Sequence, residues 1–296
     1  MRRALLALRV PPNLLAPLAR REGTRNVLAS TAYWRGARRA LGDRDTFRRL
    51  TQGTTILMYH ALGAKGESPS RFVVPRRRFE RQMRRLARRR PVLGLAELLE
   101  HRRTHRLPPA GAVVVTFDDG YRDTRTLAHP VLRRHGLPAT LFLVSSFMGA
   151  SNEWDSDAPL TGRPLVSWDD ARELHRDGFE LGGHTRTHPV LPELAPEELD
   201  REIGGSRSDL AEALGEPPEA FAYPYGRWSD EVAEAVRRAG FACALTVKAG
   251  RNGPATPPYK LRRAEVRGTD SRLRFWFAVR FGDADFPERV RRRVRP

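Results

Sequence analysis

The most reactive-looking stretch of this sequence is residues 113–121, where an apolar run ends in two adjacent carboxylates. The run is rich in β-branched residues, which is typical of a buried strand. Asp118 and Asp119 follow it, and Gly120 marks a turn. Because successive strand residues point to opposite faces, the two acids can aim differently into one pocket. One could then hold a cation while the other moves a proton, although Asp-Asp-Gly alone is equally consistent with a polar turn.

Two histidines, His184 and His188, stand four residues apart just after another predicted strand, residues 179–183. In one helical turn this spacing puts both imidazoles on the same side. Two histidines and one carboxylate are a standard ligand set of catalytic zinc sites, with a coordination position left for water. Asp119 is the natural third ligand. Two histidines at this spacing are more often helix-capping or surface residues. The prediction of a metal site therefore depends on the acids that follow the strand 113–117.

A cation at this position would make water a better nucleophile, and Asp118 could accept the proton of that water. An oxyanion formed in the reaction needs donors, and the turn at 224–226 offers one. Pro224 has no N–H, so the first backbone N–H of this turn is that of Tyr225. His60 ends the predicted strand 54–60 and is the candidate acid for a leaving amine; a core histidine bonded to backbone is the alternative.

The elements that must position these residues alternate between strands and helices from about residue 54 to 280. Strands are predicted at 54–60, 113–117, 139–144, 179–183, 221–226, 242–247 and 261–266, and helices at 76–90, 95–100, 124–135, 168–177, 196–214, 230–239 and 273–281. This order predicts a parallel sheet with helices outside it. Closure into a barrel would gather the carboxyl ends of the strands, and all the polar candidates, around one mouth.

Composition is typical of a soluble globular protein, with 40% hydrophobic and 30% charged residues. The net charge of +18, nearly all of it from arginine, would attract anionic lipid, nucleic acid or an acidic substrate. No nucleic-acid-binding motif is present, so specific nucleic-acid binding is not expected. Peripheral contact with an anionic membrane remains a predicted partner. The single cysteine, Cys243, lies in an apolar run and is expected to be an inert core thiol.

Three regions are predicted: a basic N-terminal extension at 1–51, a catalytic domain at 52–282 and a basic C-terminal tail at 283–296. Apolar residues 4–8 are cut short by Arg9, which leaves too little for a convincing secretory signal. A cytoplasmic or membrane-peripheral location is therefore expected, with the extracellular space or cell envelope as the alternative. The extension could be an interfacial amphipathic segment or helices packed on the domain.

Three motifs carry a family resemblance over roughly residues 52–280: the stretch 116–120 (TFDDG), 184–188 (HTRTH) and 223–226 (YPYG). In order and separation they resemble the first three motifs of the polysaccharide deacetylases, the NodB-homology enzymes of carbohydrate esterase family four. The resemblance implies a distorted (β/α) barrel that removes acetyl groups from N-acetylated sugars with a divalent metal, zinc above all, or cobalt or nickel. It implies that Asp118 is the base and that Asp119, His184 and His188 are the ligands.

Two departures from the family pattern stand out. Ala222 replaces the arginine that usually opens the third motif, and no histidine follows His188, so the usual C-terminal acid is absent. The combination is similar to the permuted branch of poly-N-acetylglucosamine deacetylases, in which an N-terminal strand supplies the acid; His60 fits that position. Arg263 is the candidate substitute for the missing arginine.

The predicted function is metal-dependent N-deacetylation of an amino-sugar polysaccharide or glycolipid. Trp154, Trp228 and Tyr225 are candidates for stacking on sugar rings, whereas Trp168 is expected to pack in the core. Two alternatives stay open: a catalytically impaired carbohydrate-binding barrel, and a basic protein that binds anionic membranes or nucleic acid.

Overall fold

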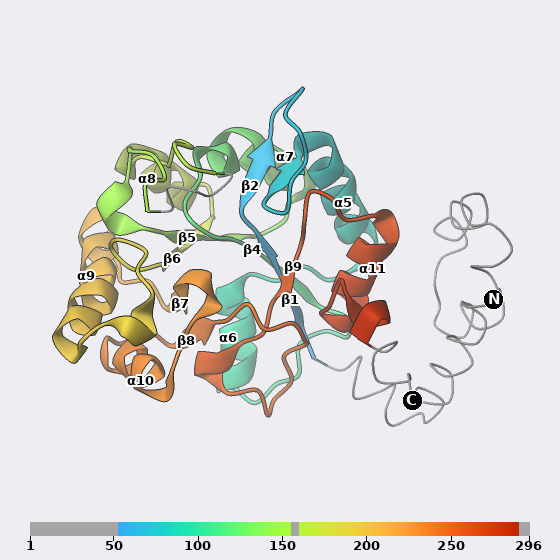
Figure 1. Cartoon of the computed structure of the whole chain (residues 1–296). Helices are drawn as coiled ribbons and strands as arrows, with labels where there is room; N and C mark the ends of the chain where they lie inside the picture. Colours follow the sequence, from blue (N-terminus) through green and yellow to red (C-terminus); the bar gives the residue numbers. More distant parts are fainter. Residues whose placement is uncertain (1–52, 155–159, 290–296) are drawn as a thin grey trace, which may run out of the picture.

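Seven parallel strands form one strongly curved sheet at the centre of the molecule (Figure 1). The computed structural model describes residues 53–154 and 160–289. The sheet order is β8-β7-β6-β5-β4-β1-β9. The strands are β1 (Thr55–Tyr59), β4 (Val113–Phe117), β5 (Thr140–Leu143), β6 (Glu180–Gly183), β7 (Ala220–Ala222), β8 (Cys243–Leu245) and β9 (Ala264–Glu265), with a separate parallel pair of β2 (Ala61–Gly63) and β3 (Val73–Pro75). The predicted parallel sheet is confirmed.

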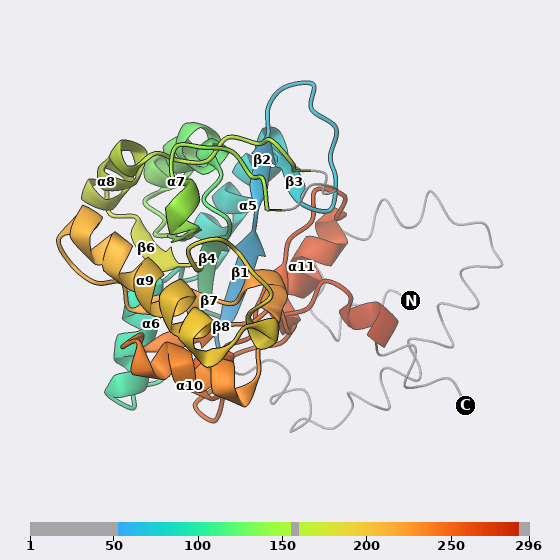
Figure 2. The ribbon, with the colours of Figure 1, turned by 60° about the vertical axis from the view of Figure 1, so that its left-hand side comes forward.

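Helices surround the outer face of this sheet, as Figures 1 and 2 show, except the helix Leu95–Arg103, which packs on the side chains that point inward. They are α5 (Arg76–Arg89), α6 (Leu95–Arg103), α7 (His129–His135), α8 (Trp168–Arg176), α9 (Pro196–Leu214), α10 (Asp230–Arg238) and α11 (Arg272–Phe281). Short turns of helix lie at Thr124–Ala128, Ser145–Phe147, Leu191–Glu193, Pro224–Gly226 and Pro258–Lys260. Each predicted helix is present with ends that differ by a few residues, except that the first part of the one predicted at 124–135 is a π-helical turn, Thr124–Ala128, before α7.

The last strand closes the curved sheet into a distorted barrel. Leu261 bridges Leu245 at the β8 edge, and Ala264 pairs with Leu57 of β1 at the opposite edge. The strand predicted at 261–266 is therefore split: its first residues bond to β8, and only Ala264–Glu265 form β9. Arg263 lies between the two halves, in the seam of the barrel.

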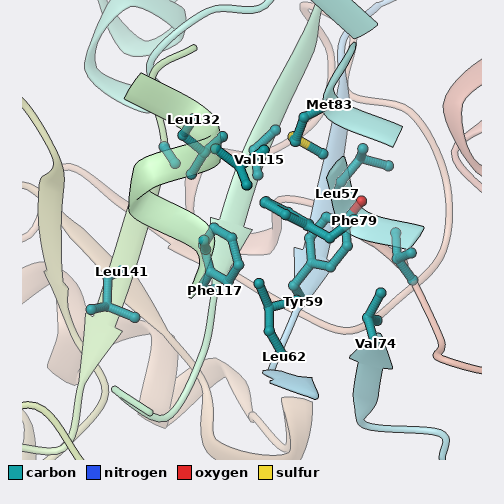
Figure 3. Close-up of a cluster of buried hydrophobic side chains, with 14 of the residues drawn as sticks. Leu57, Tyr59, Leu62, Val74, Phe79, Met83, Val115, Phe117, Leu132 and Leu141 are labelled. Atoms are coloured by element: carbon teal, nitrogen blue, oxygen red, sulfur yellow. The ribbon is translucent and has the colours of Figure 1, made fainter. Parts of the chain in front are cut away.

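Strand alternation divides the apolar residues between two layers. Ile56, Val114 and Phe142 point into the barrel, where they form one buried cluster with residues of α6. Their neighbours Leu57 and Val115 point outward, into a second cluster under α5 and α7. Figure 3 shows this outer cluster, whose labelled side chains are Leu57, Tyr59, Leu62, Val74, Phe79, Met83, Val115, Phe117, Leu132 and Leu141. Burial of such side chains, each contributing about 1.5–3 kcal/mol, fixes the strand register on which the site depends.

Several sequence predictions concern the ends of the chain and the surface. The extension predicted at 1–51 lies outside the described residues. In the predicted tail, Phe286 stacks on Phe281 of α11 with ring centroids 4.1 Å apart, so residues 283–289 pack on the domain. Cys243 is fully buried, as expected of a core thiol. In the described part of the chain, no helix has the length and apolarity needed to cross a membrane.

Candidate active site

The two carboxylates that follow β4 enter one cavity from different directions. Alternation along β4 puts Asp118 on the inward face, with Val114 and Thr116. Asp119 would then face outward, but its φ of 72° turns the chain back, and both acids line the same cavity. Both are buried, at 3% and 7% exposure.

Asp118 is held by Arg263. The Arg263 Nη1 and Nη2 atoms donate to the two carboxylate oxygens at 2.6 and 2.7 Å, and Nε donates to the Thr246 carbonyl at 3.0 Å. Burial alone would raise the pKa of Asp118, but Arg263 and then His184 outweigh burial and lower it. Asp118 is therefore an ionised carboxylate in a fixed orientation.

Asp119, His184 and His188 come together in a buried group whose ligand atoms all lie within 4.8 Å of one another. The Nε2 atoms of both histidines face the same Asp119 oxygen, at 3.3 and 3.5 Å. The contacts of Asp119 with His184 and then His188 outweigh burial, so the pKa of Asp119 lies well below its usual range. Burial lowers the pKa of His188 and so favours its neutral form.

The hydrogen bonding of His184 tests whether a metal fits this group. Its Nδ1 lies 2.7 Å from the Ala222 carbonyl oxygen, which can only accept, so the ring proton is on Nδ1. In the neutral ring the Nε2 lone pair then points at the Asp119 oxygen, and a cation between these two acceptors would satisfy both. A donor set of two imidazoles and one carboxylate, with a backbone carbonyl orienting one ring, suits Zn²⁺. The residues present therefore fit the metal that the family resemblance implies.

The expectation that His184 and His188 occupy one helical turn is wrong. The chain bends after β6, with left-handed backbone at Thr185 and His188 (φ of 68° and 63°). The Thr185 hydroxyl accepts a hydrogen bond from the His188 amide at 2.9 Å and stabilises the bend. The two imidazoles converge because of this bend, with ring centroids 4.8 Å apart.

Unusual backbone conformations concentrate at the site. Of the five non-glycine residues with positive φ in the described chain, four line or adjoin the cavity: Asp119, Thr185, His188 and Tyr225. Left-handed conformations are uncommon for such residues and persist only where the surroundings impose them. Gly182 contributes differently, because a Cβ there would approach the Phe142 ring to 2.5 Å. Only glycine lets β6 pack that closely on the barrel interior.

His60 and Tyr225 lie on the wall of the same cavity, which has a volume of about 500 Å³. His60 follows β1 and packs edge-on against Phe72 at 5.1 Å, close enough to the two aspartates to help lower their pKa values. The ring of Tyr225 packs against His188 at 4.5 Å and is 42% exposed. The positions predicted from the ends of strands thus converge on one cavity.

The aromatic candidates separate into different environments. Trp154 lines the cavity, with its ring 4.9 Å from that of His188. Trp228 packs near Tyr223 and under the Lys260 ammonium instead, at 4.4 Å, and is not among the residues that line the cavity. Trp168 packs against the main hydrophobic cluster, as predicted.

Two features of the cavity were missed from sequence. Tyr121 is buried beside Asp119, and its hydroxyl accepts a hydrogen bond from the Asn152 amide at 2.7 Å. Burial, and then the Asp119 charge, raise the pKa of Tyr121. Because Tyr121 directly follows Asp-Asp-Gly in the sequence, it could have been predicted to lie near the acids. The second feature is the C-terminal wall, which Asp283 and Asp285 join; apolar Phe286 inside a charged stretch was the hint.

Comparison with known proteins finds relatives that share these motifs. Residues 105–244 match the polysaccharide deacetylase family model. The chain is 26% identical over 212 residues to the Bacillus subtilis protein YxkH, named as a polysaccharide deacetylase, covering 71% of this chain and 70% of that protein. It is 30% identical over 131 residues to the chitooligosaccharide deacetylase of Azorhizobium caulinodans, covering 44% of this chain and 55% of that protein.

The structural comparison extends further along the chain. The structure of IcaB from Ammonifex degensii superimposes with a TM-score of 0.66 and 25% identity, covering 78% of this chain and 97% of that one. The family model spans Asp118, Asp119, both histidines and Tyr225 but excludes His60 and Arg263. Residues 105–244, which carry the matched motifs, are therefore similar to the polysaccharide deacetylases, and the barrel around them shares the fold of such a protein.

Proposed function

We propose that this protein is a metal-dependent N-deacetylase that hydrolyses the acetamido group of an amino-sugar glycan or glycolipid. The observation that carries the proposal is the meeting of Asp119, His184 and His188 within 4.8 Å, beside an Asp118 carboxylate fixed by Arg263. The relatives include a chitooligosaccharide deacetylase, which supports N-acetylated amino sugars as the substrate class.

Asp119, His184 and His188 would hold the divalent ion, for which Zn²⁺ is the best match to the donors and Co²⁺ or Ni²⁺ the alternatives. When bound, the cation supplies Lewis-acid chemistry, since it polarises the acetyl carbonyl and makes water more acidic. The Ala222 carbonyl keeps the His184 proton on Nδ1, so that Nε2 is available as a ligand atom.

Asp118 takes the proton from the attacking water as the water oxygen bonds to the acetyl carbon. Arg263 supports this role because its two hydrogen bonds, one to each oxygen, fix the orientation of the carboxylate and keep it ionised. The pair also restricts how Asp118 can rotate, which orients its free lone pairs toward the cavity.

His60, which lines the same cavity, is the proposed acid. Scission of the carbon–nitrogen bond leaves a basic amine nitrogen, and a proton from His60 converts it into a neutral leaving group. The Tyr225 peptide N–H is the proposed donor to the carbonyl oxygen as that oxygen becomes negative. The products are acetate and the free amine of the sugar, which balances the addition of one water molecule.

Trp154 and the exposed ring of Tyr225 flank His188 and form an aromatic wall against which a sugar ring can pack. A cavity of about 500 Å³ accepts one to two sugar units of a longer chain. The catalytically impaired alternative was motivated by the missing motif arginine and the missing C-terminal histidine. Arg263 on Asp118 and His60 on the cavity wall offer replacements for both, which favours the enzyme.

Release of acetate from N-acetylglucosamine oligomers by the chelator-stripped protein, measured with and without added Zn²⁺, tests the proposal. We expect zinc-dependent release that falls by roughly two to four orders of magnitude in Asp118→Asn, which removes the base without changing its size. Asp169→Asn on the exposed start of α8 is the matched control and should leave the rate unchanged. Equal rates for Asp118→Asn and the wild type would overturn the assignment of the base.

A further inference from the structure

A groove of about 750 Å³ is lined by residues of α5 and of the start of α11 and shares no lining residue with the active-site cavity. Its walls are dominated by arginine side chains. Those used below are Arg81, Arg84, Arg85, Arg88 and Arg89 from α5 and Arg272 from the start of α11. The carboxylate that lines it, Asp270, is 4% exposed and accepts a hydrogen bond from the Arg267 amide. The groove is therefore strongly cationic.

These arginines differ from those on the other helices. Four other helices carry arginines paired with an acid three residues away: Arg103 with Glu100, Arg172 with Asp169, Arg201 with Glu198 and Arg237 with Glu234. On α5, by contrast, no arginine has a carboxylate within 4.0 Å among the residues that the structure describes. Glu80, the acid on α5, pairs instead with Arg134 of α7.

Like charges are also stacked along α5, where Arg81 and Arg85, and Arg84 and Arg88, are four residues apart. Such pairs face each other on a helix and repel. Burial first, and then repulsion from Arg89, Arg90 and Arg272, lower the pKa of Arg85. A high arginine content of the whole protein would not explain why the arginines of α5 lack acidic partners while other helices carry arginine–acid pairs. Binding of a polyanion to α5 would explain it.

We propose that the α5–α11 groove docks the protein on the phosphate groups of an anionic phospholipid surface. Guanidinium groups bind phosphate oxygens through two parallel hydrogen bonds, and a row of exposed arginines along a helix matches a plane of such groups. Arg81, Arg84 and Arg88 are all exposed, and their aliphatic stems can lie on the apolar surface beneath them while the charges reach outward.

A membrane surface explains the groove better than nucleic acid does. Proteins that hold single strands combine basic residues with exposed aromatic rings on which bases stack. The exposed large hydrophobic residues of the described chain are Leu107, Tyr225 and Val247, and none of them lies in the groove. Two aromatic residues do line the groove, Phe275 and Trp276, but they are buried, with 5% and 6% of their surface exposed.

The test compares binding of the full chain to vesicles of phosphatidylcholine with binding to vesicles that also contain phosphatidylglycerol. We expect binding only to the second kind, and weaker binding as salt is raised, because salt screens the attraction. The triple variant Arg81→Gln, Arg84→Gln, Arg88→Gln should bind about a hundredfold more weakly, since each arginine near an anionic surface contributes about fivefold.

The control triple Arg106→Gln, Arg176→Gln, Arg238→Gln removes the same charge from exposed positions near α6, α8 and α10. It should lose little vesicle binding, and both triples should keep the thermal stability and the deacetylase rate on soluble oligomers. If both triple variants lost vesicle binding equally, the loss would follow from net charge rather than from α5, and the proposal would be overturned. Vesicle binding at the wild-type level in the α5 triple variant would also overturn the proposal. So would a variant that loses binding to an oligonucleotide but keeps binding to vesicles.

Discussion

The Arg263 guanidinium and the Asp118 carboxylate form a two-bond ion pair at 2.6 and 2.7 Å across 145 residues of sequence. Both side chains are buried, at 0% and 4% exposure. The pair therefore joins the seam that closes the barrel to the strand that carries the proposed base. Breaking it would affect stability and chemistry together, because the remaining charge would be left buried without a partner.

Replacement of Arg263 separates these two effects. Arg263→Met should lower the free energy of unfolding by about 3–5 kcal/mol, because the buried Asp118 carboxylate loses its partner and must either stay unpaired or take up a proton. Adding Asp118→Asn removes that charge, so the double variant should regain part of the loss in a urea titration. Arg263→Lys keeps the charge but cannot bond both oxygens, and should retain most stability while kcat/KM falls at least about tenfold. Unchanged stability in Arg263→Met would contradict the role of the pair.

His60 is expected to act only where the leaving group needs a proton. His60→Gln should lower kcat for N-acetylglucosamine oligomers by roughly two to four orders of magnitude. Nitrophenyl acetate has a leaving group that departs without protonation, so the same variant should hydrolyse it at nearly the wild-type rate.

Asp118→Asn is the comparison for this experiment, because loss of the base should slow both substrates. Were His60→Gln to lose both activities equally, His60 would act on the nucleophile or on the structure rather than as the acid. Retention of both activities would remove it from the mechanism.

The strands and the positions at their ends could be predicted because the signals are local. An apolar run that stops at a polar residue marks where a buried strand reaches solvent, and this located His60, Asp118 and His184. Parallel topology then brings those ends to one mouth. Helix bounds such as those of α9, Pro196–Leu214, followed from proline at the start and glycine after the end.

The details that required tertiary structure could not be read in the same way. The bend at 184–188 depends on left-handed backbone at Thr185 and His188, which helical spacing cannot indicate. The contact of Arg263 with Asp118 depends on how the barrel closes, so the sequence offered it only as a candidate. Packing of Phe286 on Phe281 brings the C-terminal segment to the cavity through a contact that a basic composition conceals.

Cys243 provides a prediction about stability and pH. Burial raises the pKa of its thiol to about 12, well above the value of about 8.5 for an exposed thiol. The stabilising contribution of the buried, protonated thiol is fully present below the unfolded-state pKa and is lost as the pH rises toward the folded-state pKa. Between about pH 9 and 11, the free energy of unfolding should therefore decrease by about 1.4 kcal/mol per pH unit more in the wild type than in Cys243→Ala. Urea titrations under reducing conditions would measure this, and parallel pH profiles for the two proteins would argue against a buried thiol.

Calorimetric titration of Zn²⁺ into the chelator-stripped full chain tests most directly whether Asp119, His184 and His188 form one metal site. The account predicts one zinc ion per chain, with affinity reduced at least about a hundredfold in Asp119→Ala and in His184→Ala, because each removes a ligand. His175→Ala, on the outer face of α8, is the matched control and should bind like the wild type. Wild-type zinc affinity in Asp119→Ala and His184→Ala would contradict the shared site, and with it the proposed deacetylase mechanism.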